Sequence, residues 1–282
     1  MSGVFDLELE EYVFVEKSME KSCVAQLYGV AEASKAETGG GEGVEVIKNE
    51  PYSDENGKGQ YTYKIYHFSS KVPAIIRVLA PSGALELYEE AWNAYPHCKT
   101  VLTNGYMKEN FKLVTESLHV DGSRGEIENA LGSSPEILAQ REVVLIDVAN
   151  DKIEAKDYKE EEDPQLYTSQ RTGRGPLNAD WIKTVTPVMT CYKLVTVEFK
   201  WFGLQNKIEA FIHSVMQSLF TKFHRQLFCW TDRWYGMTLD DIRELEERTK
   251  RDLDESRAKP PPTTTQTTQK ARKTQTTEAP NK

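Results

Sequence analysis

Residues 199–235 read FKWFGLQNKIEAFIHSVMQSLFTKFHRQLFCWTDRWY, and this stretch decides the fold more than any other. Two adjacent aromatic residues, Trp201 and Phe202, open it beside Gly203. Apolar residues then recur at steps of three and four, which predicts an amphipathic helix. They are Leu204, Ile208, Phe211, Ile212, Val215, Leu219, Phe223, Leu227 and Trp230. A helix of about thirty residues would span roughly 45 Å. We therefore expect it to lie along a large curved sheet, with room for a ligand between them.

Several segments before this helix have the composition of strands. They are rich in β-branched and aromatic residues, and most are bounded by Gly, Pro, Asn or Asp. The segments are Tyr61–Phe68, Ala74–Leu79, Cys98–Thr103, Phe111–Ser117, Glu142–Val148 and Tyr192–Lys200. Many strands with few long helices between them favour an α+β fold with a curved, mostly antiparallel sheet. If Leu87–Tyr95 is helical, Glu89 and Asn93 lie on one face of that helix.

A second helix is predicted after Gly236. Thr238 and Asp241 resemble a capping box, and a thin apolar stripe follows on a charged segment. We expect a lid helix at about residues 239–257 that docks on the surface and can be displaced. From Lys259 onward the chain is rich in Pro and Thr, which is typical of disorder. The predicted organisation is one domain, residues 1–257, followed by a disordered tail, residues 258–282.

Composition excludes several classes of function. The chain has 282 residues and a net charge of −9, which argues against nucleic-acid binding. No apolar run approaches the ~20 residues that span a bilayer, and the acidic start MSGVFDLELEEY is not a targeting signal. The four cysteines are scattered and lack zinc-ligand spacing. We expect a cytoplasmic protein with reduced thiols.

Known catalytic motifs are absent from the sequence. It contains no G-x-S-x-G, H-E-x-x-H, C-x-x-C or G-x-x-x-x-G-K-[ST] pattern, and the five histidines form no spaced cluster. The run GGGEG reads as a turn, because no strand and helix flank it as a phosphate loop requires. We expect no catalytic residue, no metal and no cofactor.

Polar residues on apolar strand faces are more informative. Side chains alternate along a strand, so Lys193 shares a face with Val195, Val197 and Phe199. A buried lysine is costly unless it meets an anion. Lys193 either meets one or reaches solvent from the end of its strand.

Thr62 and Lys64 repeat this arrangement, because they share a face with Tyr66 and Phe68. Lysines, hydroxyls, an amide and a carboxylate around an apolar enclosure suit a phosphorylated polyol with a hydrocarbon tail.

Many sequence blocks resemble the class I phosphatidylinositol transfer proteins. The blocks are QLYGVAEASKAETGGGEGVEV, GQYTYKIYH, AWNAYPHCKTV, EEDP, TGRGPL, CYKLVTVEFKWFGLQNK and FHRQLFCW. The resemblance extends from about Val13 to Arg257. It implies a START-like helix-grip fold, in which long helices close a concave antiparallel sheet around one lipid. It also implies exchange of phosphatidylinositol and phosphatidylcholine between membranes, one molecule per cycle, with the phospholipid as cargo.

The resemblance further implies roles for individual residues. The positions that match headgroup contacts of the family are Thr62, Lys64, Glu89, Asn93, Thr100, Lys193, Glu246, Gln26 and Cys98. Trp201 and Phe202 match an aromatic pair at the membrane-docking end, where the family usually has two tryptophans. Ser169 matches a regulatory phosphorylation position, although its surroundings, TSQR, are not strongly basic. The implied protein is a monomer that touches membranes transiently and has lipid kinases among its expected partners.

Three alternatives stay open at this point. A scaffold that presents phosphatidylinositol to a lipid kinase would have the same site, and it would keep stimulating the kinase after vesicle exchange is blocked. A lipid-modifying enzyme is disfavoured because nucleophile, metal and acid–base signatures are absent. A START-like carrier of ceramide or sterol is disfavoured because every inositol-contact position is filled.

Overall fold

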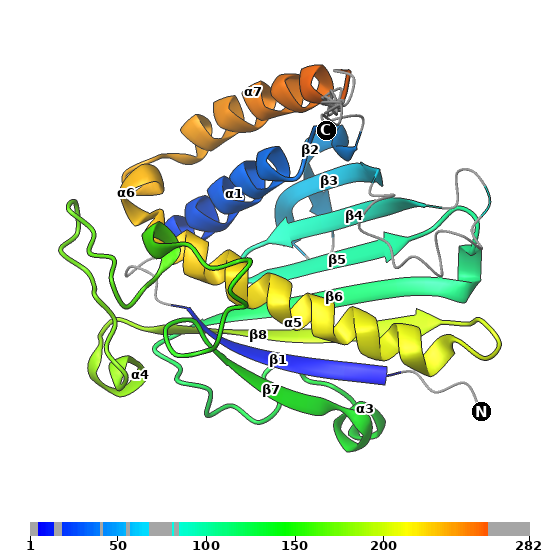
Figure 1. Cartoon of the computed structure of the whole chain (residues 1–282), viewed down its shortest axis with the longest axis horizontal. Helices are drawn as coiled ribbons and strands as arrows, with labels where there is room; N and C mark the ends of the chain where they lie inside the picture. The colour runs from blue at the N-terminus through cyan, green and yellow to red at the C-terminus, as the bar shows by residue number, and fades with distance from the viewer. Residues whose placement is uncertain are drawn as a thin grey trace, which may run out of the picture.

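The computed structural model describes residues 5–13, 19–39, 42–54, 57–67, 81 and 85–258. In Figure 1 a single twisted sheet forms one layer, and the long helix α5 (Gln205–Cys229) crosses one of its faces. Helices α1 (Met19–Ala36) and α7 (Leu239–Ala258) lie together at the edge that carries β2 (Gly43–Asp54). The predicted α+β fold with a START-like arrangement is confirmed.

Within the described residues, the sheet has eight strands in the order β2-β3-β4-β5-β6-β8-β1-β7. All neighbours are antiparallel except β1 and β7, which are parallel. The other strands are β1 (Phe5–Val13), β3 (Gly57–His67), β4 (Glu86–Ala94), β5 (His97–Thr103), β6 (Phe111–Asp121), β7 (Glu142–Asp147) and β8 (Met189–Phe199). The shorter helices are α3 (Pro135–Gln140), α4 (Trp181–Thr184), α6 (Thr231–Trp234) and the 3₁₀ turns Lys108–Asn110 and Glu160–Glu162.

The segment Leu87–Tyr95 is not helical. It forms β4, paired with β3 on one side and β5 on the other, so its backbone groups join two ladders. Glu89 and Asn93 still share a face, because four residues are two full strand repeats. The predicted strand Ala74–Leu79 lies outside the described residues.

The long helix is shorter than predicted. Helix α5 has 25 residues. It ends at Cys229, and Trp230 separates it from the short helix α6. Its sheet-facing side is also narrower than the full apolar stripe. Ile208 is buried against the sheet, whereas Phe211, Val215 and Leu219 are 43%, 45% and 52% exposed. A helix offers roughly one side to a sheet, and these three residues lie at the margin of that side.

Helix α7 matches the predicted lid helix and extends it by one residue to Ala258. The backbone N–H of Thr238 donates to Asp241 Oδ2 at 2.8 Å, and the Asp241 N–H donates to Thr238 Oγ1 at 3.1 Å, so the capping box is present. Ile242, Leu245 and Leu253 are all buried. Helix α7 therefore rests on a mainly apolar stripe, which the buried Thr249 interrupts. The rest of the predicted tail, residues 259–282, lies outside the described residues.

Candidate functional site

One face of the sheet carries polar residues in a row across five strands. Residues directly opposite one another in an antiparallel ladder project to the same side. From β3 through β4, β5 and β6 to β8, the row is Gln60, Asn93, Cys98, Ser117 and Lys193. The next row along the strands is Thr62, Ala91, Thr100, Thr115 and Val195. Sequence positions that are far apart thus share one surface.

A third row shows where this polarity ends. It consists of Lys64, Glu89, Leu102, Leu113 and Val197. On β3 and β4 the row is still charged, whereas on β5, β6 and β8 it is apolar. Polar groups therefore gather at the β3–β4 corner and along the first row, and hydrocarbon fills the opposite corner.

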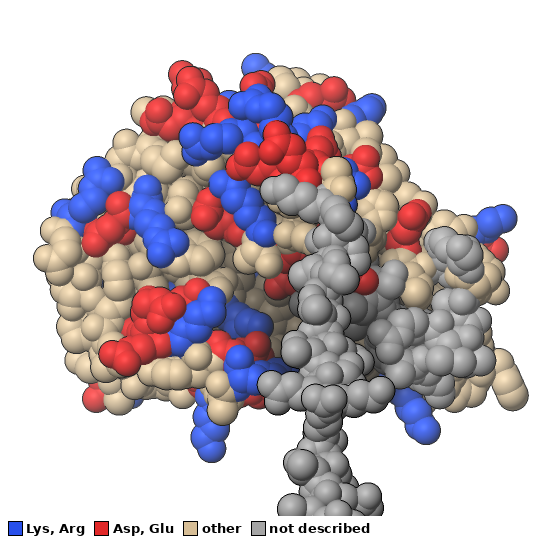
Figure 2. Space-filling view, turned by 45° about the horizontal axis from the view of Figure 1, so that its top comes forward, with Lys and Arg blue, Asp and Glu red and all other residues tan. Residues whose placement is uncertain are grey.

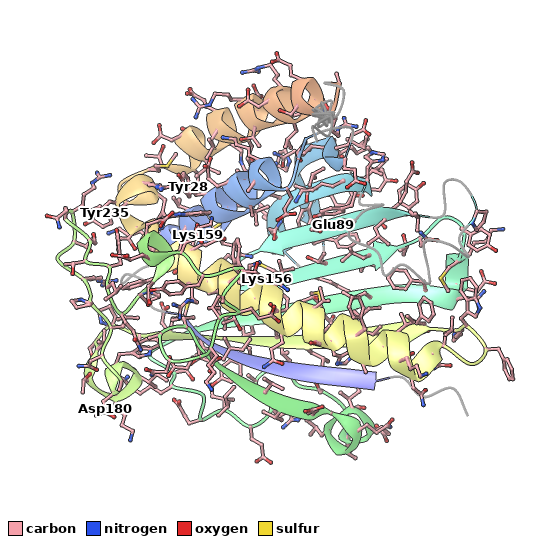
Figure 3. All side chains as sticks on the ribbon, viewed as in Figure 1. Tyr28, Glu89, Lys156, Lys159, Asp180 and Tyr235 are labelled. Carbon is pink, nitrogen blue, oxygen red and sulfur yellow. The ribbon has the colours of Figure 1, made fainter. Side chains whose placement is uncertain are left out.

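Lys64 and Glu89 form an ion pair at this polar corner. Lys64 Nζ lies 3.1 Å from Glu89 Oε1, and both side chains are nearly buried. The Tyr66 hydroxyl donates to Glu89 Oε2 at 2.7 Å. Burial, together with the Glu89 carboxylate, raises the pKa of Tyr66 well above its ordinary value, so Tyr66 stays a neutral donor. Figure 3 shows Glu89 on β4, in the half of the sheet nearest α1 and α7.

The hydroxyl of Thr62 has no hydrogen-bond partner among the residues that the structure describes. The side chain is buried beside Lys64 on β3. A buried hydroxyl without a partner costs about 1–3 kcal/mol. Such an atom is well placed to bond a polar ligand.

Lys193 does not reach solvent from its strand end, because it is only 5% exposed. Its Nζ lies 2.8 Å from Cys191 Sγ and 5.1 Å from the centre of the Phe220 ring on α5. The buried ammonium therefore sits at the boundary between the polar row and the helix. The solvent-exposed alternative for Lys193 is excluded.

Cys98 lies in the first row beneath helix α1. The Gln26 side chain of α1 hydrogen-bonds to it, and Lys193 and Cys191 are close enough to influence it electrostatically. Burial raises the pKa of the Cys98 thiol to about 12. The thiol is therefore neutral near pH 7, and Gln26 joins the same polar group from above the sheet.

A chain of side-chain amides connects the sheet to helix α7. Gln60 Nε2 donates to Asn49 Oδ1 at 2.7 Å, and Asn49 Nδ2 donates to Glu246 Oε2 at 2.8 Å. Arg243 also donates to Glu246 from within α7. Because Gln60 belongs to the first polar row, Glu246 is coupled to that row through β2.

The apolar corner lies under α5. Its buried residues come from the ends of β6 and β8, from β7 and from the first turns of the helix. They are Phe111, Leu113, Ile146, Val195, Val197, Phe199 and Ile208. Partly buried residues such as Leu102, Met216 and Phe220 pack against them. This corner presents hydrocarbon next to a polar surface, as an amphiphilic ligand requires.

Trp201 and Phe202 differ in how far their side chains are exposed to solvent. Trp201 is partly buried and stacks on Phe199, with ring centres 6.2 Å apart and an angle of 7° between the planes. Phe202 is fully exposed. Figure 1 shows the β8–α5 loop that carries them at the end of the molecule opposite α6. The two aromatics form one anchored and one projecting group.

Ser169 is 1% exposed. Its hydroxyl donates to Asp232, which also accepts the backbone N–H groups of Gln170 and Arg171. Burial alone would raise the pKa of Asp232, but these hydrogen bonds outweigh it and lower the pKa below its ordinary value. In this arrangement the predicted phosphorylation site is enclosed.

The described ranges hold neither a candidate metal site nor a helix that could span a membrane. Among these residues, no group of three or more His, Cys, Asp or Glu side chains is placed to hold a metal ion. None of the described helices combines the length and apolar character needed to cross a membrane. Over α7, Figure 2 shows Lys and Arg interspersed with Asp and Glu rather than a field of one sign.

Comparison with known proteins identifies the family of this chain. The model of the family described as phosphatidylinositol transfer protein matches residues 8–251. The chain belongs to this family. The human phosphatidylinositol transfer protein beta isoform is 50% identical over 246 residues, which cover 85% of this chain and 90% of the relative. The Bos taurus beta isoform is 50% identical over 248 residues, or 86% and 91%. Phosphatidylinositol transfer protein 1 of Dictyostelium discoideum is 49% identical over 243 residues, or 86% and 92%. The resemblance to this family is confirmed.

In this family member, the structure brings the predicted headgroup residues together. Thr62, Lys64, Glu89, Asn93, Cys98, Thr100 and Lys193 occupy three adjacent rows of one sheet face. Gln26 joins them from α1, and Glu246 joins through Asn49.

Asn49 and Gln60 were missed at the level of sequence. Gln60 could have been found, because residues two apart on a strand share a face and Gln60 therefore lies on the same face as Thr62 and Lys64. Asn49 could not, because a bulge between Val46 and Lys48 shifts the β2 register.

Proposed function

We propose that the protein binds one phospholipid and exchanges phosphatidylinositol and phosphatidylcholine between membranes without covalent chemistry. The observation that carries the proposal is the division of one sheet face into a polar and an apolar corner. A phospholipid has the same division between headgroup and acyl chains. The cargo is the only bound molecule that the function needs, and no metal or other cofactor takes part.

The polar rows supply the chemistry that an inositol phosphate headgroup needs. Lys64 and Lys193 are cations for the phosphate, and Gln26 lies on the phosphate side. Hydroxyl, amide and carboxylate groups bond a polyol, which both donates and accepts. The groups assigned to the inositol ring are Thr62, Glu89, Asn93 and Thr100. Cys98 contributes a neutral, weakly polar wall beside them.

Glu246 connects headgroup identity with closure of α7. An inositol hydroxyl can donate to its carboxylate, whereas choline has no donor there. Asn49 and Arg243 already hold one of its oxygens. Phosphatidylinositol would therefore strengthen the closed position of α7 more than phosphatidylcholine does.

The energetics favour a carrier that opens only at a membrane. A two-chain phospholipid has roughly thirty methylenes, so exposing it to water costs on the order of 25 kcal/mol. A protein interior replaces bilayer hydrocarbon with protein hydrocarbon, so the net cost of transfer is small. Opening in water would expose both the chains and the apolar corner.

We assign membrane docking to the β8–α5 loop. Phe202 inserts into the interface, and Trp201 supports it from the Phe199 stack. Phe202 keeps the apolar bulk of a tryptophan but lacks the indole N–H that suits the interface. The protein would act as a cytoplasmic monomer that binds membranes transiently and hands phosphatidylinositol to lipid kinases.

Phosphorylation of Ser169 would require the loop that contains residues 169–171 to open first. The hydroxyl is enclosed and bonded to Asp232, and a phosphate would add about two negative charges beside that carboxylate. We propose that the modification would detach residues 169–171 from α6. Mass spectrometry of protein purified from cells tests whether Ser169 is modified.

The test of the proposed function is native mass spectrometry of protein from cells, followed by a vesicle exchange assay. We expect one phosphatidylinositol or phosphatidylcholine per chain, released unchanged, and exchange of both lipids. Ceramide or sterol in the protein would overturn the proposed cargo. A chemically altered phospholipid after long incubation would overturn the absence of catalysis.

A further inference from the structure

A buried carboxylate lies directly behind the loop that carries Phe202. Glu209, in the second turn of α5, is only 1% exposed. Its Oε1 accepts the backbone N–H of Phe199 at 3.0 Å and the Gln205 side-chain amide at 3.1 Å. Its Oε2 is buried and has no partner among the described residues. Nothing in the headgroup site uses this group.

The carboxylate binds the backbone of the last residue of β8. In the described residues, the register of β1 with β8 ends with Phe5 opposite Val197, two residues before Phe199. Glu209 then receives the Phe199 N–H from across the loop. The final residue of β8 is thereby joined to α5 by a side chain.

The loop between these anchors is held at several points. The Lys200 N–H donates to the Asn110 carbonyl at 2.7 Å, and the Leu204 N–H donates to the Trp201 carbonyl at 3.0 Å. Gly203 turns the chain with φ +76°, a conformation that favours glycine. Between these fixed points only Phe202 projects completely into solvent.

Burying a carboxylate beside this apolar cluster is unfavourable unless hydrogen bonds offset the lost hydration. A methionine or leucine could fill the space at lower cost. The specific gain from Glu209 is an acceptor that fixes the end of β8 against the first turns of α5. The segment that this acceptor orders is the β8–α5 loop.

We infer that Glu209 is a positioning residue for membrane docking, which holds the loop so that Phe202 is presented ready for insertion. This inference rests on the proposed function. A preordered loop binds a lipid surface more tightly because less conformational entropy is lost on insertion. Glu209 acts through Phe202 and does not touch the lipid cargo.

The experiment measures binding of lipid-loaded protein to phosphatidylcholine vesicles by co-sedimentation. We expect Glu209→Met to weaken binding about fivefold, the factor that corresponds to one hydrogen bond of about 1 kcal/mol. Glu209→Gln keeps an acceptor at Oε1 and should restore at least half of the lost affinity. In a Phe202→Ala background, Glu209→Met should cause no further loss.

A second variant covers the case in which Glu209→Met does not fold. Gln205→Ala removes the amide that donates to Glu209 Oε1, and we expect a loss of about twofold, again absent in the Phe202→Ala background. Equal losses with and without Phe202, or no loss in either background, would overturn the inference. Lipid content and exchange by the unsubstituted protein report separately on the proposed function, so its failure would be recognised independently.

Discussion

The polar and apolar corners of the sheet are built on the same strands, yet they impose different demands on a ligand. At the β3–β4 corner, the Lys64–Glu89 pair and the Thr62 hydroxyl require matched hydrogen bonds. Under α5, residues such as Leu113 and Val197 require only hydrocarbon of suitable volume. Hydrogen bonding discriminates between ligands more sharply than apolar contact does. Selection between headgroups should therefore reside in the first corner, and general lipid retention in the second.

The largest expected effect comes from the apolar corner. Leu113 is 4% exposed, and Leu113→Ala should lower the free energy of unfolding by about 2–4 kcal/mol, through lost burial and a residual cavity. Urea unfolding measures this. Transfer of phosphatidylinositol and phosphatidylcholine should fall by the same factor. The matched control, Leu113→Met, should cost under about 1.5 kcal/mol. A change in the ratio of the two lipids would contradict the division between corners.

Thr62→Asp should separate the two lipids by about a hundredfold. The substitution puts a second carboxylate in the corner that holds Glu89, and like charges in such a site cost several kcal/mol. Under the proposed function, the neutral inositol ring loses the hydrogen-bond donor of the Thr62 hydroxyl, whereas the positive choline group is attracted to the new charge. Transfer assays with each lipid measure the ratio. Thr62→Ser keeps the hydroxyl and should behave like the unsubstituted protein. Equal loss of both lipids would refute headgroup selection by this residue.

Asn49→Ala should lower the ratio of phosphatidylinositol to phosphatidylcholine transfer by about tenfold. It removes the donor to Glu246, and a hydrogen bond to a charged group contributes about 1.5–3 kcal/mol. Competitive loading from mixed vesicles, followed by lipid mass spectrometry, measures the preference. Asn49→Asp tests the same connection with a repulsive partner and should lower the ratio further. An unchanged ratio in both variants would show that Glu246 is oriented without Asn49.

The sequence predicts the helices and strands better than it predicts which of them lie next to each other. Alternation along β8 placed Lys193 on the same face as Val195 and Val197, and the structure has this arrangement. Which strand lies beside which depends on pairing between distant segments, so the rows across the sheet could not be derived. The segment Leu87–Tyr95 was ambiguous for the same reason, because ladder pairing on both sides overrides its local preference. The family resemblance identified the headgroup residues, and the strand register explains why they lie next to one another on one face of the sheet.

The smallest expected effect concerns Cys98, which lies in the first polar row but brings little polarity. Its thiol has a pKa of about 12 because of burial, so it is protonated below about pH 11 and carries no charge toward a phosphate. Cys98→Ala should therefore change the ratio of the two lipids less than about twofold, as expected for the loss of a weak donor. Between pH 6 and pH 9, the transfer ratio of the Cys98→Ala variant should run parallel to that of the unsubstituted protein. The opposite result would be a pH dependence of the ratio in the unsubstituted protein that is absent from Cys98→Ala. It would mean that opening of α7 lowers the pKa of the Cys98 thiol, and that Cys98 meets the phosphate as a thiolate.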